Sequence, residues 1–264
     1  MARDVEPSTG LRLAEVWLAK HGLDDVRPTP LLATRLVVRE RARLGAAVIL
    51  AVLIIASGLA ALPAFDGDRT LGPLRLLALV ALVVGLLLAQ SLLDRWVRRV
   101  DRRAGAALSR RVTHPVHPGW RTVLGWPYAV FAAATCVGAM VLVASALAVP
   151  DPAVRQVAAG LLIGLLGLTA VNAMHLRHLL RRPVVAEDEG SLTADVIMRI
   201  EDARDLTRPI VQLALPMTFL FGVAPGWWSA TAVAFLILSM IACVALPFRT
   251  PSSATVARRA MSGR

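Results

Sequence analysis

Acidic side chains are missing from all the long apolar stretches of this sequence. The chain of 264 residues contains 18 Asp and Glu residues, and each of them lies outside the apolar runs described below. Proton-coupled carriers and pumps place carboxylates deep in the membrane, because a group there must bind and release the proton. The sequence therefore argues against a proton-coupled transporter.

Catalytic motifs are absent as well. Cys136 and Cys243 lie far apart within apolar runs, so they form neither a CxxC pair nor a secreted disulfide framework. The chain has no HExxH motif, Ser229 is not part of a GxSxG motif, and no Walker lysine follows a glycine loop. We therefore expect no enzymatic activity, no cofactor and no bound metal.

Apolar residues, in contrast, are abundant and gathered into runs. They make up 56% of the chain, above the roughly 45–50% of soluble domains. Five runs approach the roughly 20 residues with which a helix crosses about 30 Å of hydrocarbon, and a sixth is shorter. We predict membrane spans at residues 45–62, 74–93, 128–149, 154–176, 209–223 and 227–248.

The basic residues predict the orientation of these spans. The net charge is +11, and 29 residues are basic, of which only Lys20 is lysine. If both termini are cytoplasmic, 26 of the 29 lie in cytoplasmic segments, and only Arg69, Arg75 and Arg155 lie outside. Eight arginines fall between residues 92 and 121. We expect them to rest on anionic headgroups of the inner leaflet; no nucleic-acid-binding motif accompanies them.

These observations predict an all-α integral membrane protein with six transmembrane helices in three hairpins. Residues 1–44 form a cytoplasmic, interfacial helical N-terminus, 45–248 the six-span bundle, and 249–264 a basic cytoplasmic tail. Heavy use of Arg, Ala, Leu and Val suggests GC-rich coding. We therefore expect the plasma (inner) membrane of a bacterium.

Amphipathic helices are predicted outside the spans. Gly10–His21 has apolar residues at helical spacing, with Gly22 as its stop. Leu31–Leu44 is expected to run into the first span, and Asp94–Arg111 to continue the second. Such helices either lie in the headgroup layer or dock a cytoplasmic partner, and the headgroup layer is the favoured reading.

Ser191–Thr207 is a further amphipathic segment of this kind. Asp195 and Arg199 are spaced as an i,i+4 ion pair within it. Its apolar residues share one helical face: Leu192, Val196, Ile200 and Ala203.

Five positions are candidates for contacting a ligand or a neighbouring helix: Gln90, Asn172, His175, Gln212 and Pro216. An offset of 82 residues relates Gln90 to Asn172, either by hairpin duplication or by chance. Pro216 would free the carbonyl of Gln212 and kink its helix. Polar residues in spans also bond neighbouring helices, at about 0.6 kcal/mol on average.

Gly160, Gly164 and Gly167 form a stripe of small residues in the fourth run. Such a stripe permits close backbone approach. It indicates either packing within the bundle or a homo-oligomer seam.

Our leading hypothesis is a non-catalytic multi-pass membrane protein that serves as a subunit or accessory of a larger assembly. Its working surface is cytoplasmic, since the external connections are short. The partner would be a cytoplasmic protein, either an ATPase or a regulator.

Two alternatives stay open. The layout resembles that of ABC-2-type permease subunits, which have six spans, internal termini, an N-terminal interfacial helix and a cytoplasmic helix that meets the ATPase. The resemblance assigns those two helices to Leu31–Leu44 and Asp94–Arg111 and covers layout only. The other alternative is a lipid-modifying enzyme whose catalytic histidines would be His114, His117, His175 and His178.

Overall fold

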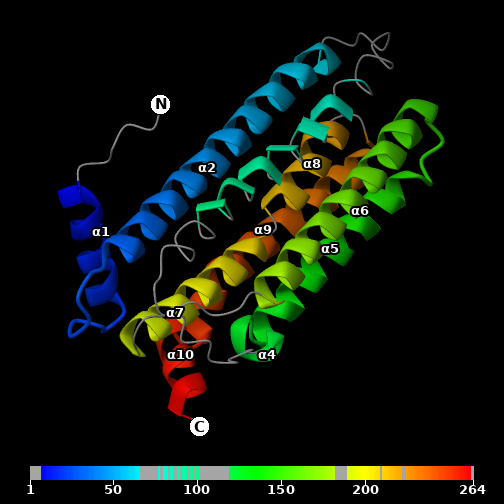
Figure 1. Ribbon diagram of the computed structural model, residues 1–264. Helices are drawn as coiled ribbons and strands as arrows, with labels where there is room; N and C mark the ends of the chain where they lie inside the picture. Colours follow the sequence, from blue (N-terminus) through cyan, green and yellow to red (C-terminus); the bar gives the residue numbers. More distant parts are fainter. Residues whose placement is uncertain are drawn as a thin grey trace.

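The protein is all-helical in the part of the chain that the computed structural model describes (Figure 1). That part comprises residues 7–65, 119–181, 189–208, 210–221 and 224–262, with scattered residues between 77 and 100. The helices are α1 (Pro7–Lys20), α2 (Pro30–Phe65), α4 (Trp120–Val123), α5 (Trp126–Ala146), α6 (Pro152–Arg181), α7 (Glu189–Leu206), α8 (Ile210–Leu220), α9 (Gly226–Arg249) and α10 (Ser253–Ser262).

Three helices, α5, α6 and α9, are long and apolar enough to cross a membrane, with 21, 30 and 24 residues. They coincide with the predicted spans 128–149, 154–176 and 227–248. Large apolar side chains on them are exposed, including Ile163 at 72% and Leu238 at 66%. An exposed apolar surface of this kind is suited to contact with lipid.

The other three predicted spans are not shown as crossings. The run at 45–62 lies inside α2, which has 36 residues and continues the predicted N-terminal helix without a break. The run at 74–93 is described only in part. The run at 209–223 contains α8, whose 11 residues extend about 16 Å, too short for about 30 Å of hydrocarbon.

The helix ends are sorted between the two ends of the bundle (Figure 1). The turn from α5 to α6 and the start of α9 lie at one end. The arginine-bearing ends of α6 and α9, at Arg181 and Arg249, lie at the other, together with α1, α4, α7 and α10. We call the four helices at that end the end bundle.

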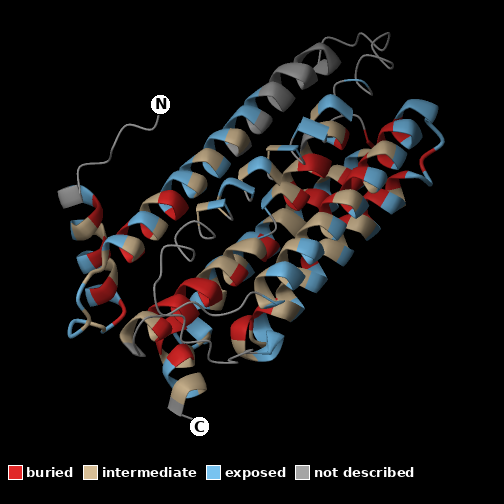
Figure 2. Ribbon diagram, in the orientation of Figure 1, coloured by how far each residue is buried: buried red, intermediate tan, exposed pale blue. Residues whose placement is uncertain are grey.

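One apolar core lies where α5, α6, α8 and α9 cross (Figure 2). Trp228 is fully buried there, and its indole Nε1 donates to the carbonyl oxygen of Leu142 at 2.9 Å. A Cβ on Gly138 would lie 2.6 Å from the ring of Phe235, so glycine admits the close contact of α5 with α9. Of the glycine stripe on α6, Gly164 is buried within this bundle.

A second group of buried residues surrounds α7 in the end bundle (Figure 2). Met198 packs with residues of α1 and α2, whereas Ile197 and Ile200 pack with residues of α4 and α10. The sequence analysis favoured a position for this helix in the headgroup layer, which stays a prediction, but it recognised only one apolar face. The helix has a second apolar face, and protein covers both.

Candidate functional site

A stripe of arginines on α2 faces the acidic side chains of α7. Arg39 and Arg43 are one helical turn apart and therefore lie on one face. The Nε of Arg39 lies 3.0 Å from Oδ2 of Asp202, and Nη2 of Arg43 lies 2.9 Å from Oδ2 of Asp205. These ion pairs join two helices that lie about 160 residues apart in the sequence.

The same stripe continues to Arg35, which makes a close ion pair with Asp195. Asp195 also pairs with Arg199 at 3.4 Å, so the predicted i,i+4 pair is confirmed. The side chains of Asp195 and Arg199 are only 5% and 6% exposed. Charges this deeply buried are tolerated when paired and are costly when a partner is removed.

A pocket of about 320 Å³ opens beside the ion pairs Arg39–Asp202 and Arg43–Asp205. Its volume is within the range of small-molecule sites. It lies among α2, α6, α7, α8 and the segment containing residues 93 and 97. The lining side chains are Arg39, Ala42, Arg43, Ala46, Leu93, Val97, Asn172, His175, His178, Leu179, Asp202, Asp205, Leu206, Arg208, Val211 and Gln212.

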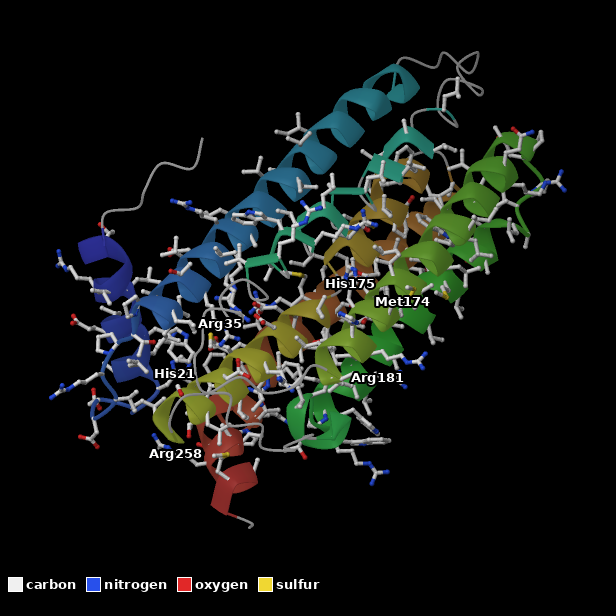
Figure 3. All side chains as sticks on the ribbon, in the orientation of Figure 1. His21, Arg35, Met174, His175, Arg181 and Arg258 are labelled. Atoms are coloured by element: carbon white, nitrogen blue, oxygen red, sulfur yellow. The ribbon has the colours of Figure 1, made fainter. Side chains whose placement is uncertain are left out.

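Three of the five candidate positions from the sequence meet in this pocket: Asn172, His175 and Gln212. Figure 3 shows His175 on α6 pointing toward α8. Pro216 is not part of the pocket but lines a separate cavity of about 10 Å³, which Gln212 also lines. Gln90 lies outside the described residues, as do His114 and His117.

Gln212 is the most informative of these residues. Its side chain is buried, with the residue 4% exposed, and it lines the pocket near the start of α8. It makes no side-chain hydrogen bond within the described part of the chain. Neither its amide nitrogen nor its amide oxygen is fully enclosed, so the amide borders the free space of the pocket and can bond a group that enters it.

Charged side chains of both signs line the pocket. Three guanidinium groups, those of Arg39, Arg43 and Arg208, face two carboxylates, those of Asp202 and Asp205. Arg208 Nη2 lies 3.2 Å from Oδ1 of Asp205, which is shared with Arg43. A third carboxylate, that of Glu201, lies 3.9 Å from Nη2 of Arg43.

Sequence reasoning missed the role of the α2 arginines, which were interpreted only as anchors for topology. A signal was present: Arg35, Arg39 and Arg43 recur every four residues on one helical face. Asp195, Asp202 and Asp205 recur at spacings of seven and three residues, another single face. The sequence did not show that these two faces, about 160 residues apart in the chain, contact each other, and the structure did.

A further polar contact fastens α1 to α7. The Nδ1 of His21 donates to the carbonyl of Trp17 at 2.7 Å, and Nε2 lies 3.0 Å from Oε1 of Glu201. Burial lowers the pKa of His21, but the bonds to Glu201 and Trp17 raise it by more, so it lies above the ordinary 6.5. Burial raises the pKa of Glu201 and is the largest single effect, but the hydrogen bond and charge of His21, the charge of Arg43 and a bond with Trp17 together lower it by more, so it lies below 4.5.

Guanidinium groups, amides and imidazoles line the pocket together with apolar side chains. Within the described residues, no group of three or more His, Cys, Asp and Glu side chains is placed to hold a metal ion. The arrangement is therefore one that can bind a polar or anionic group with an attached apolar part.

In the part of the chain that the structure describes, fold and surface together define the class: all-helical, with three helices long and apolar enough to span a membrane. Comparison with models of known families, with curated proteins and with solved structures finds no match. A proposal for the function of this chain therefore rests on its own residues and their geometry.

Proposed function

We propose that the chain is a non-catalytic, multi-pass plasma-membrane protein of a bacterium that serves as a subunit of a larger assembly. In this proposal six helices cross the bilayer and both termini are cytoplasmic. The end bundle is then the cytoplasmic part, and it meets a protein partner. The observation that carries the proposal is the ion-pair contact between α2 and α7.

This contact supports a coupling role because α2 belongs to both parts of the molecule. The helix begins at Pro30 beside α1 and continues for 36 residues to Phe65. Leu32, Ala33 and Leu36 are buried against α1 and α7, whereas Val48 and Val52 farther along are about 60% exposed. A force on the end bundle would therefore move the apolar half of α2 as a unit.

The partner is tested by purification in a mild detergent, with a charge-swap series as the probe. Asp202→Arg breaks the pair with Arg39 and places like charges together. We expect wild-type protein to copurify with one cytoplasmic protein at constant stoichiometry, and the Asp202→Arg variant to lose it. The double variant Arg39→Asp with Asp202→Arg should recover the partner.

Topology is tested separately, by labelling single cysteines on intact cells with an impermeant reagent. Cys136 and Cys243 are first replaced by alanine. We expect Ala153→Cys, in the first turn of α6, to react, and Ala260→Cys, in α10, to stay protected. Labelling in the opposite sense would refute the orientation. Wild-type protein that purifies alone in every detergent would refute the assembly.

A second candidate is the permease subunit of an ATP-driven transporter. The observation that favours it is the position of the pocket, which helices from all three predicted hairpins surround. A copurified ATPase whose turnover depends on this chain would support the permease. A partner without nucleotide hydrolysis would support the accessory subunit.

A further inference from the structure

The pocket lies at the level where three separate elements change from apolar to charged. On α2, Val48 and Leu44 are exposed and apolar, and Arg43 begins the arginine stripe. On α6, Met174 is 68% exposed, and the exposed Arg177 follows within one turn (Figure 3). In a membrane-spanning helix such a change marks the boundary between hydrocarbon and headgroups.

The segment around residue 93 shows the same change. Leu92 is 62% exposed, Arg95 is exposed, and the following residue, Trp96, is 37% exposed. Tryptophan is enriched at the headgroup level of membranes. This segment packs on α2 at the same height, because a Cβ on Gly45 would lie 3.3 Å from Cδ2 of Leu93.

The break between α7 and α8 adds hydrogen-bond donors to the pocket. α7 ends at Leu206, and α8 begins at Ile210, so the first turn of α8 places Val211 and Gln212 in the lining. The first four amides of a helix lack acceptors within the helix, and they favour anions. On the other side of the break, Thr207 Oγ1 donates to the carbonyl of Arg204 at 2.7 Å, which satisfies one carbonyl at the end of α7.

We propose that this pocket binds a phosphate ester, the chemistry of an anionic phospholipid headgroup. The guanidinium groups, the α8 amides and the pocket-facing amide of Gln212 receive the phosphate oxygens. The apolar wall of Ala46, Leu93 and Val97 receives the attached glycerol and the first part of an acyl chain. Basic pockets between membrane helices on the cytoplasmic side are the known form of such sites. The inference goes beyond the proposed function and needs no protein partner.

Two adjacent alanines on α2 provide a matched test. Ala46 lines the pocket and Ala47 does not, although both are exposed. In Ala46→Trp the indole fills the pocket, and we expect the Kd for phosphatidylglycerol to rise about tenfold or more, as for the loss of charged hydrogen bonds. Ala47→Trp should bind as wild type does. Binding is titrated by native mass spectrometry of the full chain in detergent.

A second variant removes a donor without filling space. Gln212→Leu keeps the volume and should fold, since an apolar side chain of similar size suits a position that is 4% exposed. We expect it also to raise the Kd about tenfold. Gln156→Leu, on the exposed surface at the start of α6, is its control.

Three probes separate the sources of the phosphate. Binding of phosphatidylglycerol without binding of glycerol phosphate assigns the site to a lipid headgroup. Binding of glycerol phosphate alone assigns it to a soluble phosphate ester, and either result supports the proposal. The proposal is overturned if diacylglycerol, which lacks phosphate, binds as well as phosphatidylglycerol, or if Ala46→Trp and Gln212→Leu both bind as wild type.

Discussion

Arg258 of α10 closes the end of α1 by donating to the carbonyl oxygen of Gly22 at 2.8 Å. The same guanidinium nitrogen lies 3.0 Å from the carbonyl oxygen of His21. The last carbonyls of a helix lack partners within it, so a cation there satisfies them and complements the helix dipole. A residue near the C-terminal end of the chain thus stabilises its first helix.

Substitution of Gly22 by alanine should destabilise the protein in two ways. Gly22 has a φ of +65°, which costs an alanine about 1–2 kcal/mol. Its new Cβ would also lie 2.6 Å from Nη2 of Arg258, so the guanidinium would have to move. We expect a lower melting temperature in detergent, measured by scanning fluorimetry.

The control for that prediction is Gly119→Ala, where φ is −58° and nothing lies within 4 Å of the added Cβ. It should change the melting temperature little. If Gly22→Ala leaves the melting temperature unchanged as well, the left-handed end of α1 has no energetic role.

The attachment of α1 should weaken as the pH rises. The pKa of His21 is raised in the fold, so its contribution is complete below pH 6.5 and is lost as pH rises through the folded pKa. The pKa of Glu201 is lowered, so its contribution is complete above pH 4.5 and is lost as pH falls through the folded pKa. Lys20, Arg43 and Arg258 are the charged neighbours of the pair.

Hydrogen exchange of the α1 amides measures this effect, after correction for the intrinsic rate. Protection should be highest between pH 4.5 and pH 6.5 and should fall as the pH rises through the raised pKa of His21. His21→Gln should remove this fall in protection. His178→Gln should keep it, because His178 lies in the pocket and not beside α1. If the fall in protection persists in His21→Gln, a group other than His21 is responsible for it.

Asp195→Asn should be the most destabilising single change among the acidic residues of α7. It would leave the guanidinium groups of Arg35 and Arg199 beside a neutral amide, at side-chain exposures of 12% and 6%. Breaking a buried ion pair on one side costs about 3–5 kcal/mol. The free energy of unfolding is measured by denaturation in mixed micelles.

The exposed Asp25 serves as the control for that change. Asp25→Asn should shift the free energy of unfolding by less than about 0.5 kcal/mol. Equal effects of the two substitutions would show that the Asp195 pairs contribute no more than an exposed charge.

Trp228→Phe should weaken the contact of α9 with α5. The substitution removes the buried hydrogen bond to the Leu142 carbonyl and leaves that acceptor unsatisfied, at about 1–3 kcal/mol. Trp227, the preceding residue, is 57% exposed, so Trp227→Phe should have little effect. The comparison of the two melting temperatures is the measurement, and similar losses for both would contradict the prediction.

Predictions from local sequence patterns were correct where the whole pattern lay within one helix. Uniform apolar runs of sufficient length predicted α5, α6 and α9, because a helix of about 20 apolar residues is specified by its own composition. Gly22 was predicted to end the first helix, and it adopts the left-handed conformation that glycine tolerates. The segment at 209–223 was harder, because its length and Pro216 were consistent with several structures.

The candidate site was predicted in part. Asn172, His175 and Gln212 were singled out one by one as polar residues in apolar surroundings, and the fold brings them into one pocket. Their common location was not predictable, because Asn172 and Gln212 are on different helices whose relative positions depend on packing. The α2 arginines were assigned to the membrane surface, since a single sequence does not show that an acidic face lies opposite.

By itself, the sequence determined the helical class, the three helices that are long and apolar enough to cross a membrane, and the separation of most arginines from the apolar runs. These properties follow from local composition and helical periodicity, which need no knowledge of neighbours. The tertiary structure alone decided that α7 is enclosed by protein, that Arg35, Arg39 and Arg43 pair with its aspartates, and that a pocket forms beside them. The physical reason is that burial and ion pairing depend on which helix faces meet.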